Sequence, residues 1–463
     1  MRASLRQSIE NVFGINLPMS ERMEDEILTW KAMYEDTPIW AQKGVEPVGI
    51  PSAVASEIAR LTTMEMEVNV SGSAMGDYLN ENLLDFLDNA REYTEYACAT
   101  GGVMFKPSYN QNTGMIDVSV VYADEFFPTR IDSKKRIVGA VFPDQTIIND
   151  YKYTRLERHE LLGNNLIIQN RVFCKKYSDM SSDIESVLGN ECLLTDVPEW
   201  EYIEPLTIIR NVDKPLFAYF KMPMANHIEK RSPLGVSVYA KAKNRIKRAD
   251  DQWAKIAWEY NATQAAVFAD DDMFRHSPSG DLAMEENERR MYRTLDGFQK
   301  QFEIYSPTIR DTSLFNGLQN YFRSIEFQCN LAYGTLSDPN NVDKTAEEIR
   351  ASKQRSFSMI CDIQKAFEKA HRDLLEAMHS IAVLYGACQD GAYEASFEFD
   401  DSIAVNRNEM FAELMQLASA GMIRPEYVTS WYFNVSEEEA LKMIAPAFDD
   451  TEDEKLPDEV QEE

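Results

Sequence analysis

The segment that most constrains the fold is a long apolar stripe between Thr345 and Tyr385. Its members recur at steps of three or four residues, namely Ile349, Ser352, Ser356, Ile360, Ile363, Phe367, Ala370, Leu374, Met378 and Ile381. This spacing predicts one amphipathic helix roughly 60 Å long at about 1.5 Å per residue, longer than one small globule requires. The stripe becomes strongly apolar only after Ile360, so we expect the serine-bearing first turns to be less buried.

A polar loop directly precedes this helix. Pro339, Asn340 and Asn341 favour turn conformations and resist regular structure. Thr345 is followed three residues later by Glu348, the spacing of a capping box, in which the threonine oxygen accepts from an orphan amide and the glutamate reaches back. The sequence therefore predicts a flexible loop joined to a firmly defined helix start.

Length and charge limit what the chain can do. Its 463 residues favour about three structural units. Its formal net charge is −30, whereas proteins that grip nucleic acid do so through Lys and Arg, so the chain as a whole should repel DNA and any contact should be local. Residues 448–463, FDDTEDEKLPDEVQEE, are acidic and poor in apolar groups, which is typical of a solvated, disordered tail.

The remaining patterns predict a mainly helical α+β fold. Helical spacing recurs in residues 20–34, 51–63, 78–100, 242–260, 313–332, 407–421 and 436–445. Residues 103–177 contain β-rich runs separated by the turns NQNTG, IDSKK and GNN, which predict an antiparallel sheet. A short helix is expected at 282–295, and β structure at 302–305 and 393–405. Residues 178–231 support no clear assignment.

The cysteines and the apolar runs indicate a cytosolic protein. The six cysteines are widely scattered and form no CxxC pair, so we expect buried, reduced thiols rather than disulfides or a zinc site: Cys98, Cys174, Cys192, Cys329, Cys361 and Cys388. The first residues lack the apolar region of a secretory signal. No window approaches the ~18 apolar residues of a membrane span.

Enzyme signatures are largely absent. There is no GxxxxGK[ST] phosphate loop and no GxGxxG after a strand, and His159 lacks the second histidine of a HExxH site. His371 and His379 lie two turns apart on the long helix without a nearby sequence partner. Aspartates at 270–272 and 400–401 are clustered as in two-metal nucleases, but consecutive aspartates diverge around a helix and alternate along a strand. We therefore expect no catalytic residue, no metal site, no cofactor and no enzyme activity.

One basic cluster stands out on the helix predicted at 242–260. It comprises Lys241, Lys243, Arg245, Lys247 and Arg248. A solvated helix face is the usual meaning of such a cluster, and a phosphate contact is the alternative.

Several segments follow one another in a definite order: SPLGVSVYAKAKNRIKRADDQWAKIAWEY, a polar insertion, a second helix, a loop, TAEEI, and FEFDDSIAVNRNEM before AGMIRPEYV, with ATGGVMFKPSYN and VYADEFFPTR upstream. In this order they resemble tailed-bacteriophage portal proteins. The resemblance covers residues 21–445 and lies in the order and spacing of these segments rather than in one diagnostic motif.

The resemblance implies a division into the parts of a portal subunit. These would be a wing (1–232), stem helix 1 (233–269), a clip (270–311), stem helix 2 (312–332), a tunnel loop (333–344), a long wing helix with a β segment (345–400), a crown (401–447) and the acidic tail (448–463). The tunnel loop, which would narrow the channel, comprises Tyr333, Gly334, Thr335, Leu336, Ser337, Asp338, Pro339, Asn340, Asn341, Val342, Asp343 and Lys344.

The resemblance also implies a non-enzymatic ring, usually of twelve copies, at one capsid vertex of a virion assembled in the host cytoplasm. Double-stranded DNA would be packaged, retained and ejected through it. Its partners would be the terminase packaging motor, a head-completion or tail adaptor protein, and the major capsid and scaffolding proteins, without any membrane. Two other functions stay open on the residues alone: a metal-dependent nuclease or hydrolase using clustered aspartates, and a helical scaffold or adaptor without a pore.

Overall fold

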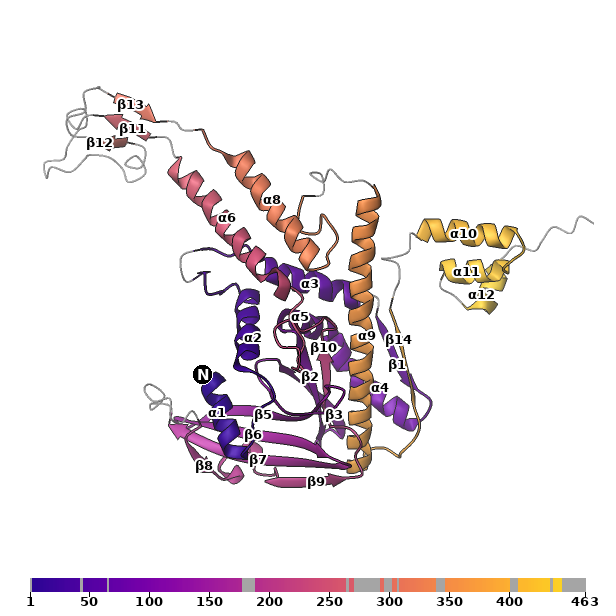
Figure 1. The fold of residues 1–463 in the computed structure, drawn as a ribbon. Helices are drawn as coiled ribbons and strands as arrows, with labels where there is room; N and C mark the ends of the chain where they lie inside the picture. Colours follow the sequence, from indigo (N-terminus) through magenta and orange to yellow (C-terminus); the bar gives the residue numbers. More distant parts are fainter. Residues whose placement is uncertain are drawn as a thin grey trace, which may run out of the picture. The chain divides into compact units, whose positions relative to one another are not determined.

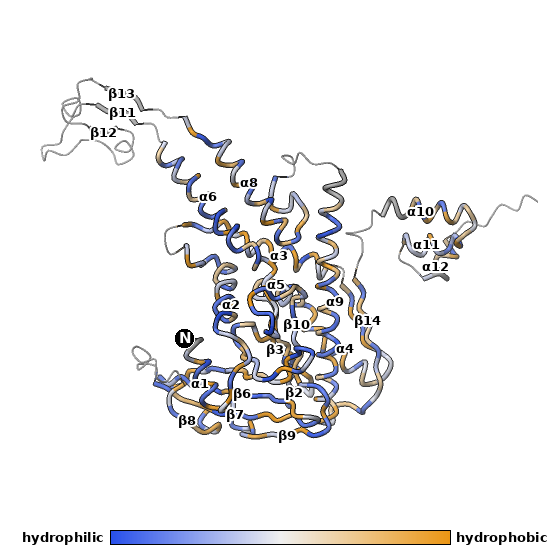
Figure 2. Tube along the Cα trace, viewed as in Figure 1, coloured by the Kyte–Doolittle hydropathy of each residue, from blue (hydrophilic) through white to orange (hydrophobic). Residues whose placement is uncertain are grey.

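The predicted long helix is present in the computed structural model as α9, Ala346–Tyr385, which has 40 residues (Figure 1). Polar and apolar residues alternate along it (Figure 2), and its stripe from Ile360 to Ile381 is buried. The expectation of less buried first turns is wrong for Ser352 and Ser356, which are only 2% and 8% exposed. The chain that leaves the preceding helix reaches Ser352, whose Oγ accepts a hydrogen bond from the amide of Tyr333.

The structure describes residues 2–41, 45–64, 66–176, 188–263, 266–269, 292–294, 302–305, 308–338, 346–399, 407–433 and 436–443. The chain divides into two compact units, Met1–Phe399 and Asp400–Glu463. The first unit is α+β, as predicted. The described part of the second contains α10 (Arg407–Ser419), α11 (Pro425–Phe433) and α12 (Glu437–Met443). No helix within these ranges is both long and apolar enough to span a membrane.

Five helices lie within the first 100 residues, and those after the first follow the predicted pattern with one correction. They are α1 (Arg2–Phe13), α2 (Glu21–Tyr34), α3 (Ile50–Thr63), α4 (Ala74–Asp88) and α5 (Ala90–Thr100). The predicted cap Ser20 accepts from the amide of Met23. The single helix predicted at 78–100 is wrong, because the chain turns at Asn89. Leu84 of α4 is 53% exposed.

The predicted antiparallel region forms two sheets. One has the order β10-β2-β3, from β2 (Gly102–Asn110), β3 (Met115–Tyr122) and β10 (Ala218–Lys221). The other has the order β4-β5-β6-β7-β8 with β9 also on β7, from β4 (Phe127–Ile131), β5 (Ile137–Ile148), β6 (Tyr151–Leu162), β7 (Asn165–Lys176), β8 (Asn190–Cys192) and β9 (Leu206–Arg210). The three predicted turns join β2 to β3, β4 to β5 and β6 to β7, where Gly114, Lys135 and Gly163 have positive φ.

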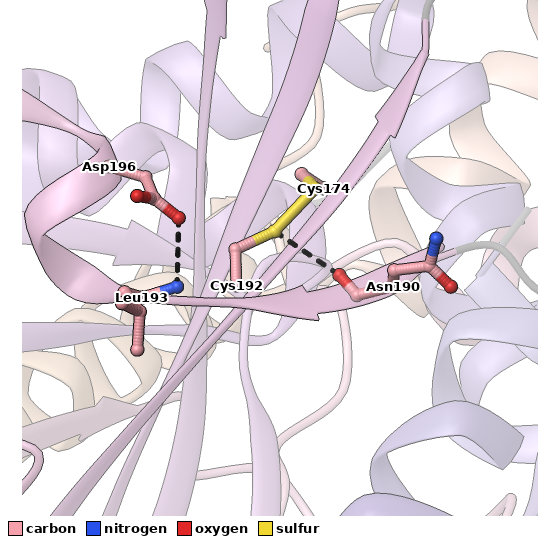
Figure 3. The surroundings of a disulfide bond; sticks show 5 residues. All are labelled: Cys174, Asn190, Cys192, Leu193 and Asp196. Atoms are coloured by element: carbon pink, nitrogen blue, oxygen red, sulfur yellow. Dashed lines mark hydrogen bonds between the residues drawn. A yellow bond between two sulfur atoms is a disulfide. The ribbon is translucent and has the colours of Figure 1, made fainter.

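The expectation that all cysteines are reduced is wrong for one pair. Cys174 on β7 and Cys192 on β8 form a disulfide, with Cα atoms 6.2 Å apart (Figure 3). Pairing of the two strands places Cys174 beside Asn190, so the register brings the two sulfur atoms together. Sequence spacing could not reveal this, because the two residues are separated by 18 positions and meet only through strand pairing. The short 3-10 turns η3 (Leu194–Asp196) and η4 (Pro198–Trp200) follow.

Two antiparallel helices project from this unit and end at a small sheet (Figure 1). They are α6 (Lys243–Ala262), preceded by the turn η5 (Ala240–Ala242), and α8 (Asp311–Gln328). The small sheet comprises β11 (Ala266–Ala269), β12 (Tyr292–Thr294) and β13 (Phe302–Tyr305). β13 was predicted, whereas the helix predicted at 282–295 is wrong in its described part, because Tyr292–Thr294 pairs with β11.

One close backbone approach explains two glycines in the segments that carry the resemblance. Gly101 ends α5 in the left-handed region, with φ of 96°. A Cβ added to Gly235 would overlap the carbonyl oxygen of Gly101, and the amide of Gly235 donates to the hydroxyl of Tyr219 at 3.1 Å. Only glycine therefore allows the chain entering α6 to pack against the end of α5. The strand pair β1 (Glu67–Ser71) and β14 (Glu394–Glu398) completes the unit.

Candidate functional site

The first half of the predicted tunnel loop is bound to the carboxylate of Glu326. Glu326 lies in the last turn of α8 and is fully buried. Its Oε1 accepts from the backbone amides of Gly334, Leu336 and Ser337 at 3.1, 2.7 and 2.8 Å. The hydroxyl of Ser337 donates to Oε2 at 2.9 Å. Because a buried carboxyl group needs hydrogen-bond donors in place of water, the chain is folded closely around this side chain.

Helix α9 holds the same stretch from the other side. Ser352 Oγ accepts from the amide of Tyr333 at 2.8 Å. The guanidinium of Arg355 lies over the rings of Phe327 and Tyr333, at 4.8 and 5.6 Å from their centroids, and donates to the Leu331 carbonyl at 3.4 Å. The stretch is thus attached to α8 and α9 at once, and it orients the two helices relative to each other.

These contacts show that the first half of the predicted loop is held in place. Residues 333–338 form a tethered turn rather than a flexible segment: Ser337 is 3% exposed, and the amide of Asp338 donates to Gln319 Oε1 at 2.8 Å. Gly334 has φ of 88°, in the left-handed region, which lets the chain reverse towards Glu326. Residues 339–344 and the capping residue Thr345 lie outside the described residues.

The predicted basic cluster is split by the structure. Lys243 binds Glu26 of α2 at 2.7 and 2.8 Å, and therefore attaches the start of α6 to the helices before the sheets. Lys241, Arg245, Lys247 and Arg248 are exposed. Within the described ranges none of these four forms an ion pair with a carboxylate. They leave a positive surface at the base of α6.

Polar contacts attach α6 to the chain before α3 and to the start of α8. Asp250 of α6 is buried and accepts from Trp40 Nε1 at 2.7 Å and from the amide of Val48 at 3.0 Å. Burial raises the pKa of this carboxyl group, while the two donors act in the opposite direction. At the far end, Arg310 donates to both oxygens of Glu259, at 3.0 and 2.8 Å.

Three large aromatic side chains on this helix pair are exposed. Trp258 is 65% exposed, Phe327 56% and Tyr260 44%. Tyr260, the last residue of the helical spacing predicted at 242–260, is thus exposed rather than buried against the core. Large aromatic side chains held in water on rigid helices are typical of a surface that another protein covers.

The remaining candidates for chemistry do not assemble into a site. His159 is buried, and its Nε2 lies 2.6 Å from Glu157, a carboxylate that also binds Lys106 at 2.6 Å. His371 is fully buried among aromatic rings, and His379 binds Asp390 at 2.9 Å. The aspartates at 270–272 and 400–401 lie outside the described residues. Within those residues, no three His, Cys, Asp or Glu side chains could hold one metal ion.

Sequence reasoning missed the anchoring residues. Glu326 flanks the apolar stripe of α8 just before a loop of turn-forming residues. Only this position in the sequence could have indicated that Glu326 binds the loop. Ser352 and Arg355 carry no signal, because an isolated serine or arginine on a long helix is ordinary. Their role depends on contacts with residues about 20 positions away.

The sequence of this chain matches one protein family. Residues 67–454 match the family described as "Phage portal protein, SPP1 Gp6-like". No curated protein sequence matches the chain.

Comparison with solved structures matches chains from gene transfer agent (GTA) particles. A chain in the virion of a native GTA particle is 11% identical with a TM-score of 0.46, covering 89% of this chain and 94% of that one. A chain in the neck of a native particle with C12 symmetry is 11% identical with a TM-score of 0.44, covering 93% and 99%. A chain in the neck of an empty particle with C6 symmetry is 10% identical with a TM-score of 0.42, covering 86% and 93%. The assignment to a family rests on the sequence match alone.

Proposed function

The chain belongs to the SPP1 Gp6-like family of phage portal proteins, and from this premise we infer that it forms the ring-shaped DNA channel at one vertex of a capsid. Its function is that of a portal protein, a structural component of the virion through which the genome is packaged, retained and ejected, and to which the tail is joined. The observation that carries this conclusion is the family match over residues 67–454. We further propose that the protein has no catalytic activity of its own.

The proposed assembly is a homo-oligomeric ring, with twelve copies as the expected number. The exposed aromatic side chains on the projecting helices, Trp258, Tyr260 and Phe327, support it, since a neighbouring copy would remove them from water. The helices themselves correspond to the proposed stem, residues 233–269 and 312–332. Residues 270–311 are proposed as the clip, which meets the packaging motor and later the adaptor, and residues 401–447 as the crown.

The net charge of the proposed ring favours passage of DNA over tight binding of DNA. Twelve copies of a chain with net charge −30 carry roughly −360 before counterions, so the ring as a whole does not attract the duplex. Lys241, Arg245, Lys247 and Arg248 are the local exception. We assign them to contacts with the passing DNA or with the acidic surface of a neighbouring subunit. In the host cytoplasm, the terminase motor, capsid and scaffolding proteins would meet this ring during assembly.

Residues 333–344 are proposed as the loop that narrows the channel. The contacts to Glu326, Ser352 and Arg355 hold residues 333–338 against the two helices. The part available to meet DNA is therefore 339–344, and the tethered turn serves as its base.

Electron microscopy of the purified full-length protein tests the assembly. We expect rings with a central hole about as wide as duplex DNA. A filament or a compact dimer without a pore would favour a scaffold or adaptor. A monomer that cleaves DNA with added magnesium or manganese would point to a nuclease instead, and would contradict the portal function.

Shortening the loop tests its assignment to the channel. Deleting residues 339–342 should leave ring assembly unchanged, because the tethered turn and both helices remain intact. DNA packaging or retention is expected to fall at least about tenfold, measured as filled capsids per infected cell. A variant with Gly and Ser at the same four positions is the control for loop length and should package more DNA than the deletion. If the deletion prevented ring formation, the loop would be structural, and its place in the channel would be wrong.

A further inference from the structure

A basic cavity of about 730 Å³ lies in the first unit, away from the loop and the projecting helices. It is bounded by the β4–β5 hairpin, β10 and the middle of α9. Seven cationic side chains line it against three carboxylates. Since the chain as a whole carries a net charge of −30, this excess of positive charge in one concave place is the reverse of the general composition.

Two of the three carboxylates that line the cavity already form ion pairs with lining cations. Asp132 accepts from Arg136 Nε at 2.7 Å and from the amides of Lys134 and Arg136, and these bonds, opposed by its desolvation, hold its pKa below the usual range. Asp373 binds Lys214 at 3.2 Å. These contacts neutralise Arg136 and Lys214, and Arg130 pairs with Glu160 at 3.5 Å. Asp213 is the third carboxylate of the lining. In the described part of the chain, the other lysines of the cavity form no ion pair with a carboxylate.

Three of those lysines converge. Lys221 is half-buried, and its Nζ donates to the Pro233 carbonyl at 2.7 Å, while Lys135 Nζ donates to the Lys230 carbonyl at 2.7 Å. Lys369 extends from α9 into the same lining. Among the described residues none of the three has a carboxylate within ion-pair distance. Burial lowers the pKa of Lys221, and the positive charges of Lys135 and Lys369 lower it further.

We propose that this cavity binds a small phosphorylated anion with several negative charges, of the polyphosphate or nucleotide class. Such an anion would relieve the repulsion among Lys135, Lys221 and Lys369, and lysine ammonium groups bind phosphate oxygens as point charges. The volume is within the ~300–1,000 Å³ of small-molecule sites. A duplex needs a basic stripe along an exposed surface, whereas these lysines line a concavity between a hairpin and a helix. The site is independent of the portal function proposed above.

Calorimetric titration of sodium tripolyphosphate into the full-length protein tests the proposal, at neutral pH and constant ionic strength. We expect saturable binding with one site per chain. The double variant Lys135→Asn and Lys369→Gln should weaken the affinity at least about tenfold, because two of three converging charges are removed. Both side chains are exposed, and asparagine tolerates the positive φ of 60° at position 135, so the variant should fold normally.

Lys365 provides the matched control. It is exposed on α9 one turn before Lys369 and does not line the cavity, so Lys365→Gln should bind as the unaltered protein does. ATP in place of tripolyphosphate separates the two sources of phosphate: tighter binding of ATP supports a nucleotide, and equal binding supports a free polyphosphate. The proposal is overturned if binding is not saturable, if Lys365→Gln loses as much affinity as the double variant, or if a short DNA duplex displaces the tripolyphosphate.

Discussion

Replacing Glu326 with alanine is expected to lower the free energy of unfolding by about 4 kcal/mol. The substitution removes the acceptor of three backbone amides and one hydroxyl, and each buried donor left without a partner costs roughly 1–3 kcal/mol, less where water reaches it. Chemical denaturation measures the total effect. Hydrogen exchange should show that the amides of Gly334, Leu336 and Ser337 lose protection, which places the damage at the base of the loop.

Two variants make this result specific. Gln319→Ala removes a single hydrogen bond, from the amide of the exposed residue Asp338, and should cost at most about 1 kcal/mol. Glu326→Gln keeps one acceptor oxygen but presents an amide group to the hydroxyl of Ser337, so its cost should lie between the other two. Glu326 is not the anchor if Glu326→Ala is no more destabilising than Gln319→Ala.

The second large effect is a loss of stability in mild acid that depends on His371. This side chain is fully buried, stacks on Phe367 at 3.7 Å between ring centroids, and donates from Nδ1 to the Phe367 carbonyl. Phe86 and Phe105 pack around it at 5.6 and 5.4 Å. Burial lowers the pKa of His371 to about 4, and the hydrogen bond to Phe367 opposes this only in part.

The direction of the pH effect follows from that lowered pKa. In the unfolded chain the imidazole takes up a proton near pH 6.5, whereas in the folded protein it stays neutral down to about pH 4. The neutral, buried imidazole therefore costs the folded protein no stability above pH 6.5. As the pH falls towards 4, the unfolded chain gains a proton that the folded protein does not bind, and the free energy of unfolding decreases. The loss attributable to this one group approaches about 3 kcal/mol at the acid end.

Denaturation curves between pH 7 and pH 4 check this expectation. His371→Leu, an apolar replacement for the neutral ring, should show a shallower fall of stability with acid than the unaltered protein. His379→Leu, on the same helix but paired with Asp390 near the surface, should keep the steep fall. Parallel curves for His371→Leu and the unaltered protein would mean that His371 does not control the acid response. Buried carboxylates such as Glu157 affect all three proteins alike and cancel in the comparison.

Local chemistry accounts for the predictions that succeeded. Ser20 caps α2 through a bond to a residue three positions away, and the turns at Gly114 and Gly163 depend on backbone conformations that glycine adopts freely. The 40-residue helix α9 follows from a periodicity within its own segment. By contrast, the break at Asn89 was missed because neither glycine nor proline marks it, and the helical spacing continues across it.

The sequence by itself determined where most of the described helices and the hairpin turns lie, the acidic charge and, through the order of its segments, the portal family. The tertiary structure alone decided which polar groups work together. It placed Glu326 under the loop, Cys174 beside Cys192, and three lysines around one cavity. The reason is physical: helix and turn formation depends on neighbours within a few residues, whereas burial and pairing depend on segments that are distant in the chain and meet only after folding.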